Sequence, residues 1–279
     1  MLLKDFIPAL QVQEFVQLYR IVHLQFDSHM QIPPKAYPPR PEQCLAFYPY
    51  DREIVEYTST KKKKANIPVV LYGQFTEVTN RVIGNNFLVF QIVFYPGALY
   101  KLLGIPSTII NNEYLSADEI WGNHVHNINE QLYYAKDYTT MVSIANEFIT
   151  TLIAKQKKAT HFIDAVCSNM LYNSQSFSLV NAAQQAFLST KQFERKFKER
   201  TGLNPKTFER VIKFDNAFRL KNAHPNFDWL KIAIECDYYD YQHLTKAYKD
   251  FTGLSPTAFH AIEEQAPERK LGLNEGYYK

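Results

Sequence analysis

The sequence contains a repeated segment whose two copies lie 51 residues apart near the C-terminus. Residues 197–208 read FKERTGLNPKTF, and residues 248–259 read YKDFTGLSPTAF. Both copies keep Lys, Thr, Gly, Leu, Pro and Phe at the same places. A repeat of this kind usually marks one supersecondary unit that is used more than once. The chain is therefore expected to contain two copies of one small fold, and with them a surface that acts in two places.

Helix start and stop signals divide the first copy into three helices. A first helix over 179–186 has small alanines on its inner side, which allow a second helix to cross closely. Ser189 and Gln192 have the spacing of a capping box, so the second helix is expected to start there. Gly202 ends it, because glycine adopts the left-handed conformation without strain. An Asn-Pro pair then starts a third helix over 205–221.

The second copy follows the same order, with Asp240 as the cap of its second helix. The inward pair Phe193 and Phe197 recurs as Leu244 and Tyr248, each pair four residues apart and so on one helix face. This order predicts two helix-turn-helix units joined by one helix. In such a unit the second helix enters the DNA major groove.

The outward side chains of the two second helices are the candidate DNA-binding residues. They are Thr190, Lys191, Gln192, Glu194, Arg195 and Lys196 in the first copy, and Tyr241, Gln242, His243, Thr245 and Lys246 in the second. Arg and Lys suit guanine, Gln suits adenine, and Thr suits either base or the thymine methyl group. Residues 189–231 carry 11 Lys and Arg against 5 Asp and Glu, whereas residues 232–279 carry 5 against 8. The first copy therefore offers the stronger attraction for phosphate.

Residues 178–262 resemble the DNA-binding domain of the AraC/XylS family of bacterial transcription regulators. The segment 233–256 is similar to the signature of the family's second motif. The resemblance implies two recognition helices in successive major-groove segments on one face of the DNA. It assigns base contacts to Lys191, Glu194, Arg195, Gln242, His243, Thr245 and Lys246, and phosphate contacts to helix N-termini, Lys206 and Arg210.

The sequence departs from the family pattern at three positions. Asp237 and Phe187 stand in the two turns where glycine is usual or frequent. Asp tolerates left-handed backbone better than most residues, so the geometry of the Phe187 turn is the less certain of the two. Lys246 stands where Arg is usual, and lysine lacks the flat bidentate fork, which predicts weaker base selectivity in the second copy.

The fold class predicted for the whole chain is α+β. Residues 1–155 are expected to form a sensor or dimerisation domain, β-rich and barrel-like to about residue 95 and helical over 97–155. Residues 160–265 form the all-α DNA-binding domain, and residues 266–279 a polar tail. The expected strands are 19–26, 44–50, 69–75 and 87–94, which are rich in aromatic and β-branched residues.

The expected helices of the first domain cover 98–103, 123–135 and 138–155, and the spacing at 116–119 predicts a capping box. The last of these helices has one apolar stripe, which indicates a core contact or, as the alternative, a dimer contact. Residues 94–121 look like part of a sensor-type domain found in some family members. That resemblance implies effector sensing or homodimerisation, and names no ligand.

Two other function classes remain as alternatives. An enzyme would use His23 and His29, or His124 and His126, but a His-x-His pair on a helix points its rings about 200° apart. A helical interaction protein without DNA binding would fit the acidic second copy. The three cysteines are far apart, and no C-x-x-C pair, signal-peptide core or membrane-length apolar stretch is present.

The preferred interpretation is a cytoplasmic transcription regulator that binds double-stranded DNA. The sequence does not distinguish an activator from a repressor. A small-molecule effector and RNA polymerase are its expected further partners. We expect no catalytic residue, metal site or cofactor, and no membrane contact.

Overall fold

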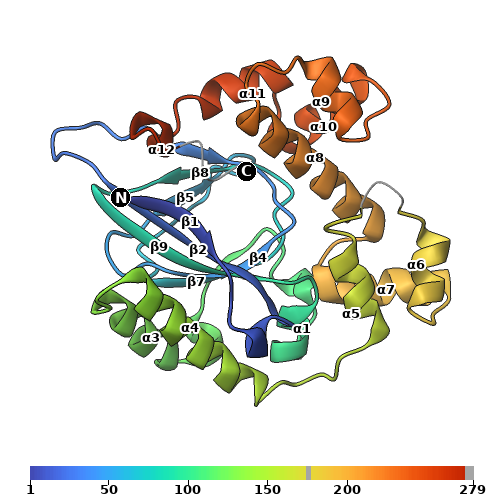
Figure 1. Ribbon diagram of the computed structural model, residues 1–279, viewed down its shortest axis with the longest axis horizontal. Coiled ribbons are helices and arrows are strands. Elements are labelled where there is room, and N and C mark those ends of the chain that lie inside the picture. The colour runs from blue at the N-terminus through green and yellow to red at the C-terminus, as the bar shows by residue number, and fades with distance from the viewer. Residues whose placement is uncertain (174–176, 274–279) are drawn as a thin grey trace.

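The computed structural model describes residues 1–173 and 177–273. Within these ranges the N-terminal half is built on two antiparallel sheets, and helices form the C-terminal half (Figure 1). The first sheet has the order β1 (Leu2–Phe6), β2 (Val16–Gln25), β9 (Asn86–Phe94), β4 (Gln43–Phe47), β7 (Val69–Tyr72) and β10 (Tyr114–Ser116). The second has the order β3 (Lys35–Tyr37), β8 (Thr79–Val82), β5 (Ile54–Tyr57) and β6 (Lys63–Ala65).

All four strands expected from the sequence lie in the first sheet, which is buried on both faces. Along β9, Leu88 and Phe90 pack in the core shared with the helices, while Phe87 and Val89 pack in the core between the two sheets. Successive side chains of a strand point to opposite faces, so the seven apolar residues of β9 serve two cores. The α+β class is confirmed, but the expected barrel is two facing sheets that do not close.

Helices cover the outer face of the first sheet (Figure 1). They are α1 (Ala98–Leu103), α2 (Asp118–Trp121), α3 (His124–Tyr133) and α4 (Tyr138–Ile153), with short 3₁₀ turns at Leu10–Val12 and Ser107–Ile109. The stripe of α4 supplies Met141, Ala145, Phe148 and Ile149 to the core of its own domain. These four side chains are therefore core residues, and the dimer interpretation of the stripe is wrong for them.

The capping box predicted at 116–119 is absent from the structure. Helix α2 starts one residue later than expected, and its N-cap Ala117 has no side chain that could accept a hydrogen bond. The Ser116 hydroxyl instead donates to the Asp118 carboxylate. Ser116 lies at the end of β10, which is paired with β7, so strand pairing fixes its backbone outside the helix.

The C-terminal half contains α5 (Phe162–Asn169), α6 (Leu179–Gln185), α7 (Thr190–Thr201), α8 (Pro205–Ala223), α9 (Trp229–Glu235), α10 (Tyr241–Thr252), α11 (Pro256–Glu263) and α12 (Pro267–Lys270). Helix α8 joins two helical cores, one around α5–α7 and one around α9–α11. None of the described helices is long and apolar enough to cross a bilayer.

The segment expected as a polar tail packs against the N-terminal half as far as the structure describes it. Pro267 and Glu268 are buried, and Leu271 and Leu273 contact the core between the sheets. Lys35 of β3 forms ion pairs with Glu268 and, at 2.6 Å, with Glu263. The segment is therefore held by its apolar residues and by the ion pairs of Lys35. The expectation of a polar tail followed from the many charged residues, and it missed the apolar residues among them.

The end of α7 contacts the N-terminal half through backbone groups. The Ser107 hydroxyl donates to the Arg200 carbonyl at 2.7 Å, and the Asn111 amide donates to the Gly202 carbonyl. Gly202 has φ +85°, and a Cβ at this position would overlap the Asn111 side chain. The helix stop predicted from the sequence is thus also a contact between the two halves.

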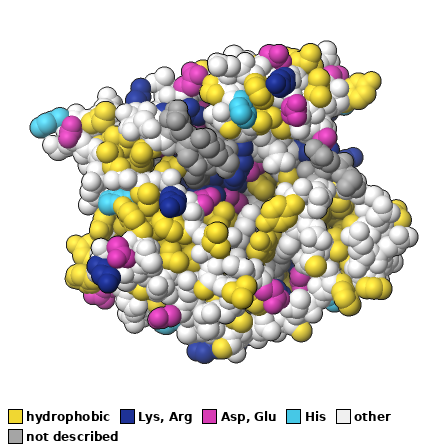
Figure 2. Space-filling view, viewed as in Figure 1, with side chains coloured by type: hydrophobic (Ala, Val, Ile, Leu, Met, Phe, Trp, Pro, Cys, Tyr) yellow, Lys and Arg dark blue, Asp and Glu magenta, His cyan; other side chains and the backbone are white. Residues whose placement is uncertain are grey.

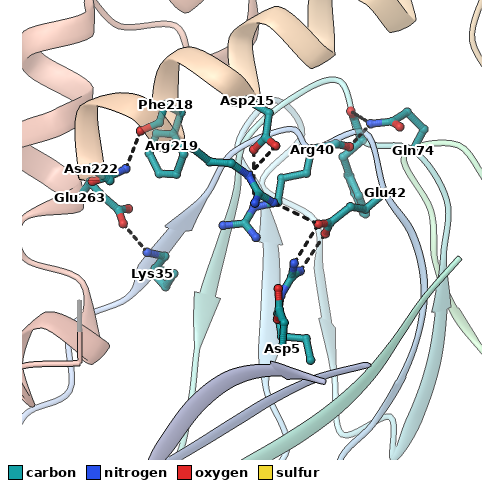
Figure 3. A network of polar contacts seen from close by, with 12 residues as sticks. Asp5, Lys35, Arg40, Glu42, Gln74, Asp215, Phe218, Arg219, Asn222 and Glu263 are labelled. Atoms are coloured by element: carbon teal, nitrogen blue, oxygen red, sulfur yellow. Dashed lines mark hydrogen bonds and ion pairs between the residues drawn. The ribbon is translucent and has the colours of Figure 1, made fainter. Parts of the chain in front are cut away.

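A chain of buried charges joins the first sheet to α8 (Figure 3). Arg20 of β2 forms a bidentate pair with Glu42 at 2.9 and 3.0 Å, and Arg219 of α8 reaches the same carboxylate at 3.5 Å. Asp215 of α8 pairs with Arg219 at 2.8 Å and lies 4.0 Å from Arg40. In Figure 2 basic and acidic side chains meet in the hollow between the two halves.

The pKa of Glu42 reflects the opposing effects of burial and of the neighbouring arginine charges. Burial alone would raise the pKa of this carboxyl group, but Arg20, Arg40 and Arg219 outweigh burial and lower the pKa to about 2. The carboxylate therefore stays charged, which matters because an unpaired charge at such a site is strongly destabilising.

The two glycine stops provide a matched pair of variants. Gly253 has φ +74° and open space around its Cβ position, so Gly253→Ala should cost about 1–2 kcal/mol for the left-handed backbone. Gly202→Ala should lose roughly a further 1–3 kcal/mol, because its methyl group displaces Asn111. Urea unfolding of both variants checks this, and equal losses would contradict the close contact at Gly202.

Glu42→Gln should destabilise the protein by about 3–5 kcal/mol near neutral pH, since it removes one partner of a buried ion network. The folded pKa of Glu42 lies below the ordinary value of 4.5, so its contribution is complete above that value and is lost as the pH falls through about 2. The stability gap between wild type and variant should therefore narrow by roughly 2 kcal/mol between pH 6 and pH 3. The exposed Glu147→Gln is the control, and a gap independent of pH would refute the assigned charge state.

Candidate nucleic-acid interface

Helix α7 begins with the capping box that the sequence predicts. The Ser189 hydroxyl accepts from the Gln192 N–H at 3.3 Å, and the Gln192 side chain accepts from the Ser189 N–H at 3.1 Å. Phe193 and Phe197 are fully buried one turn apart. This fixes the rotation of the helix, and it leaves the opposite face with its polar side chains toward solvent.

Helix α10 is held in the same way. The Asp240 carboxylate accepts from the His243 N–H at 2.8 Å, and Leu244 and Tyr248 are buried. Gly202 and Gly253 both end their helices in the left-handed conformation. The two units therefore share their caps, their inward pairs and their stops.

The turn between the two helices of each unit has one backbone geometry. In the first unit Leu188 N–H donates to the Ala183 carbonyl at 2.9 Å, around Phe187 at φ +56°. In the second, Tyr238 N–H donates to the Ala233 carbonyl at 2.9 Å, around Asp237 at φ +57°. This is the Schellman pattern of helix ends. The departures from glycine therefore leave both turns intact.

The backbone of Phe187 adopts the left-handed conformation, in which the Cβ atom is crowded. This conformation costs about 1–2 kcal/mol. Its side chain is 77% exposed and lies against Phe162 of α5, with ring centroids 4.9 Å apart. This contact offsets part of the strain.

The second unit has one more residue in its turn than the first. Ser189 follows the preceding cap Ser178 by 11 residues, whereas Asp240 follows Asp228 by 12. The additional residue is Tyr239, which is 87% exposed and packs against the His243 ring with centroids 5.8 Å apart. An aromatic side chain thus stands at the start of α10, a feature with no counterpart in the first unit.

The structure exposes most of the predicted DNA-binding residues. Exposed side chains are Thr190, Lys191, Gln192, Glu194, Arg195, Lys206, Tyr241, Gln242, His243 and Lys246, while Lys196, Arg210 and Thr245 are partly buried. The Gln192 side-chain oxygen serves the capping box, and the Thr245 hydroxyl is buried without a hydrogen-bond partner among the described residues. Arg195 is 3.7 Å from Glu199 in a solvent-exposed pair, which is weak.

A groove runs between α8 and α10 on this side of the second unit. Its lining includes Lys206, Arg210, Lys213, Asp237, Tyr238, Tyr239, His243, Lys246, Ala247 and Asp250. Arg210 crosses the groove to the Asp250 carboxylate and lies over the Phe251 ring, 5.2 Å from its centroid. The predicted phosphate contact of Arg210 would therefore compete with an ion pair inside the protein. Lys206 is exposed and has no ion-pair partner among the described residues.

The histidines of the enzyme alternative contact unrelated groups. His23 Nδ1 is 2.8 Å from the Tyr138 hydroxyl, and burial lowers the pKa of His23. His126 is paired with Asp118 at 3.4 Å, and the His124 ring packs against Phe148. Over residues 1–173 and 177–273 no group of three His, Cys, Asp or Glu side chains could hold a metal ion.

Comparison with protein-family models places the two units in a known class. A helix-turn-helix domain matches residues 182–261, which spans both units and the helix between them. The C-terminal half of the chain therefore contains a helix-turn-helix domain of the AraC type. The chain is thus a DNA-binding regulator with an AraC-type helix-turn-helix domain. A domain of unknown function (DUF6597) matches residues 4–116 of the N-terminal half.

Three solved structures that are similar to this chain come from two DNA-binding regulators, ToxT and AdpA. ToxT from Vibrio cholerae O395 is 9% identical, and the match covers 90% of this chain and 98% of that chain with a TM-score of 0.46. The DNA-binding domain of AdpA in complex with a target DNA is 21% identical, covering 38% and 95%, with a TM-score of 0.35. ToxT with a bound unsaturated fatty acid is 11% identical, covering 88% and 95%, with a TM-score of 0.47. No curated protein matches the chain.

Sequence reasoning missed Tyr239 and the charges that join the two halves. The unequal spacing of the helix caps was a visible signal for Tyr239. Arg40, Glu42 and Asp215 gave no local signal, because their partners lie far away in the sequence.

Lys246→Arg should sharpen the base preference of the second unit. An arginine at this exposed position can form the planar bidentate contact with guanine that lysine cannot. Competition binding with single-base variants of a bound DNA should show about 1–3 kcal/mol more discrimination at one position. Lys249→Arg, the same exchange in the last turn of α10, is the control; equal effects of the two variants would contradict the assigned reading position.

Proposed function

We propose that this protein reads two successive major-groove segments of one DNA duplex through α7 and α10, and that its N-terminal half controls this binding. The observation that carries the proposal is the shared geometry of the two units. Caps, inward pairs, stops and the left-handed residue of the turn recur in both units, although the second turn is one residue longer, so each unit presents the N-terminal half of its second helix to solvent. This is the part of a recognition helix that contacts base edges.

The two units are proposed to contribute differently. The exposed face of α7 carries Lys191 and Arg195, which suit phosphate and guanine. The start of α10 carries Gln242, His243 and the additional Tyr239, beside the acidic residues of the groove. We infer that α7 supplies more of the affinity, and that α10 positions the module or discriminates among bases.

Control by the N-terminal half is supported by its contacts with the DNA-binding module. Ser107 and Asn111 contact the end of α7, the Glu42 network holds α8, and Lys35 holds the segment after α11. A change in the N-terminal half would therefore reach both units. ToxT, as a similar protein, has been solved with an unsaturated fatty acid, and a small-molecule effector is our proposal for this chain as well. Homodimerisation and contact with RNA polymerase stay predictions.

Arg195→Ala should weaken binding by about 1–3 kcal/mol, or roughly 5- to 150-fold, and should relax the preference at one base position. Fluorescence anisotropy would be measured with DNA selected from a random pool by the full chain. Lys136→Ala removes an exposed cation in the loop before α4 and serves as the control.

The affinity of the wild-type protein for DNA should also fall steeply as the salt concentration rises, because neutralised phosphates release counterions.

If Arg195→Ala retains both affinity and base preference, α7 does not read the groove. If the random pool yields no enriched DNA, the helical module acts as an interaction domain instead.

A further inference from the structure

The groove between α8 and α10 borders the face of α10 that is predicted to contact bases, which we call the reading face. On the α8 side, Lys206, Arg210 and Lys213 are spaced by four and three residues, so they share one face of that helix. On the α10 side, His243 and Lys246 line the groove and also belong to the reading face. The groove has a volume of about 540 Å³, so a phosphate group fits into it.

The charged side chains of the groove are four cations and two carboxylates, which leaves the groove positive. Two of the cations are already paired. Lys213 pairs with Glu209 of its own helix at 3.0 Å, whereas Arg210 pairs with Asp250. The second pair crosses the groove from α8 to α10, so an anion that enters the groove meets it.

The position of Asp250 is unfavourable for the helix that carries it. Asp250 lies in the last turn of α10 (Tyr241–Thr252), where the free carbonyl groups give the helix end a partial negative charge. Arg210 compensates this carboxylate from the other side of the groove. Both side chains are 42% exposed, and solvent therefore weakens the pair. Another anion can thus replace the carboxylate at low cost.

Arg210 is held in the groove by a second contact that does not depend on Asp250. Its guanidinium carbon lies 5.2 Å from the centroid of the buried Phe251 ring. The hydrogen bond to Asp250 uses Nη2, and a guanidinium carries five N–H donors in a planar fork that suits phosphate. Arg210 can therefore exchange a carboxylate for a phosphate without losing its place on the ring.

The repeat places an acid at the same position in both copies. Glu199 precedes Asp250 by 51 residues, at the matching place in the repeated segment. Glu199 pairs along its own helix with Arg195 at 3.7 Å, whereas Asp250 pairs across the groove with Arg210. The two pairs thus differ in direction, and the pair of the second unit stands where α8 and α10 face each other.

We propose that Asp250 occupies, in the free protein, the place of a DNA phosphate, which displaces it from Arg210 when α10 enters the major groove. The inference rests on the proposed function, because that function brings the reading face to DNA. Phosphates border the major groove, and the walls of the protein groove include part of the reading face, so a backbone phosphate lies within reach of Arg210. Asp250 therefore weakens the binding of the second unit to DNA of any sequence, since phosphate contacts carry no sequence information.

Asp250→Asn should bind DNA about three- to tenfold more tightly than wild type at about 0.1 M salt, because Arg210 is released and a like charge is removed. Fluorescence anisotropy with DNA selected from a random pool by the full chain measures this gain. The gain should be equal for single-base variants of that DNA, and it should shrink as the salt concentration rises. Unchanged or weaker binding by folded Asp250→Asn would overturn the proposal.

Two further comparisons separate the role of Arg210 from a general effect of charge. Glu235→Gln removes an exposed carboxylate of the same unit that does not line the groove, and it should change the affinity by no more than about twofold. In an Arg210→Ala background, Asp250→Asn should lose most of its gain. An equal gain in both backgrounds would contradict the proposed exchange at Arg210.

Thermal unfolding shows whether each variant is folded. Asp250→Ala places a stronger helix former at the same position and should give the same gain, so the proposal does not depend on how α10 tolerates Asn. If the wild-type chain selects DNA and neither variant gains affinity, this inference fails and the proposed function stands. If the wild-type chain selects no DNA, the proposed function fails, and this inference fails with it.

Discussion

The buried carboxylate of Glu42 is the interaction on which the arrangement of this molecule depends. It lies between Arg20 of the first sheet and Arg219 of the helix that joins the two helix-turn-helix units. Removing charges from water is costly, and such a network is stable only when each charge finds partners of good geometry. The depressed pKa of Glu42 indicates that this condition is met. The orientation of α8, and with it the placement of both units, follows from this network together with the backbone contacts at Gly202 and the ion pairs of Lys35.

The repeat combines one scaffold with two different surfaces. Its inward pairs and the backbone hydrogen bond that closes each turn recur in both copies, even where Phe187 and Asp237 replace the glycine that the turn would accept without strain. The exposed positions have diverged, with Arg195 on α7 and Tyr239 beside α10. Packing in the protein core restricts which residues can occupy the buried positions. At the exposed positions, only contact with DNA restricts the choice of residue. This difference explains how a duplicated unit can provide affinity at one place and discrimination at the other.

The sequence was most informative where the relevant contacts are local. The caps at Ser189 and Asp240, the stops at Gly202 and Gly253 and the alternation along β9 depend on residues a few positions apart, and the structure confirms them. The links between the two halves were not predictable in this way. Glu42 and Arg219 are separated by most of the chain. Such charged residues would ordinarily be expected at the surface, so only the tertiary structure shows that they are buried.

The central claim is that one module reads two successive groove segments on one face of the duplex. Methylation interference on a DNA selected by the full chain tests it directly, because it detects contacts to guanine N7 in the major groove. The account predicts two clusters of interference whose centres lie about 10 base pairs apart, which is one helical turn. A single cluster, or two clusters on opposite faces of the duplex, would contradict it.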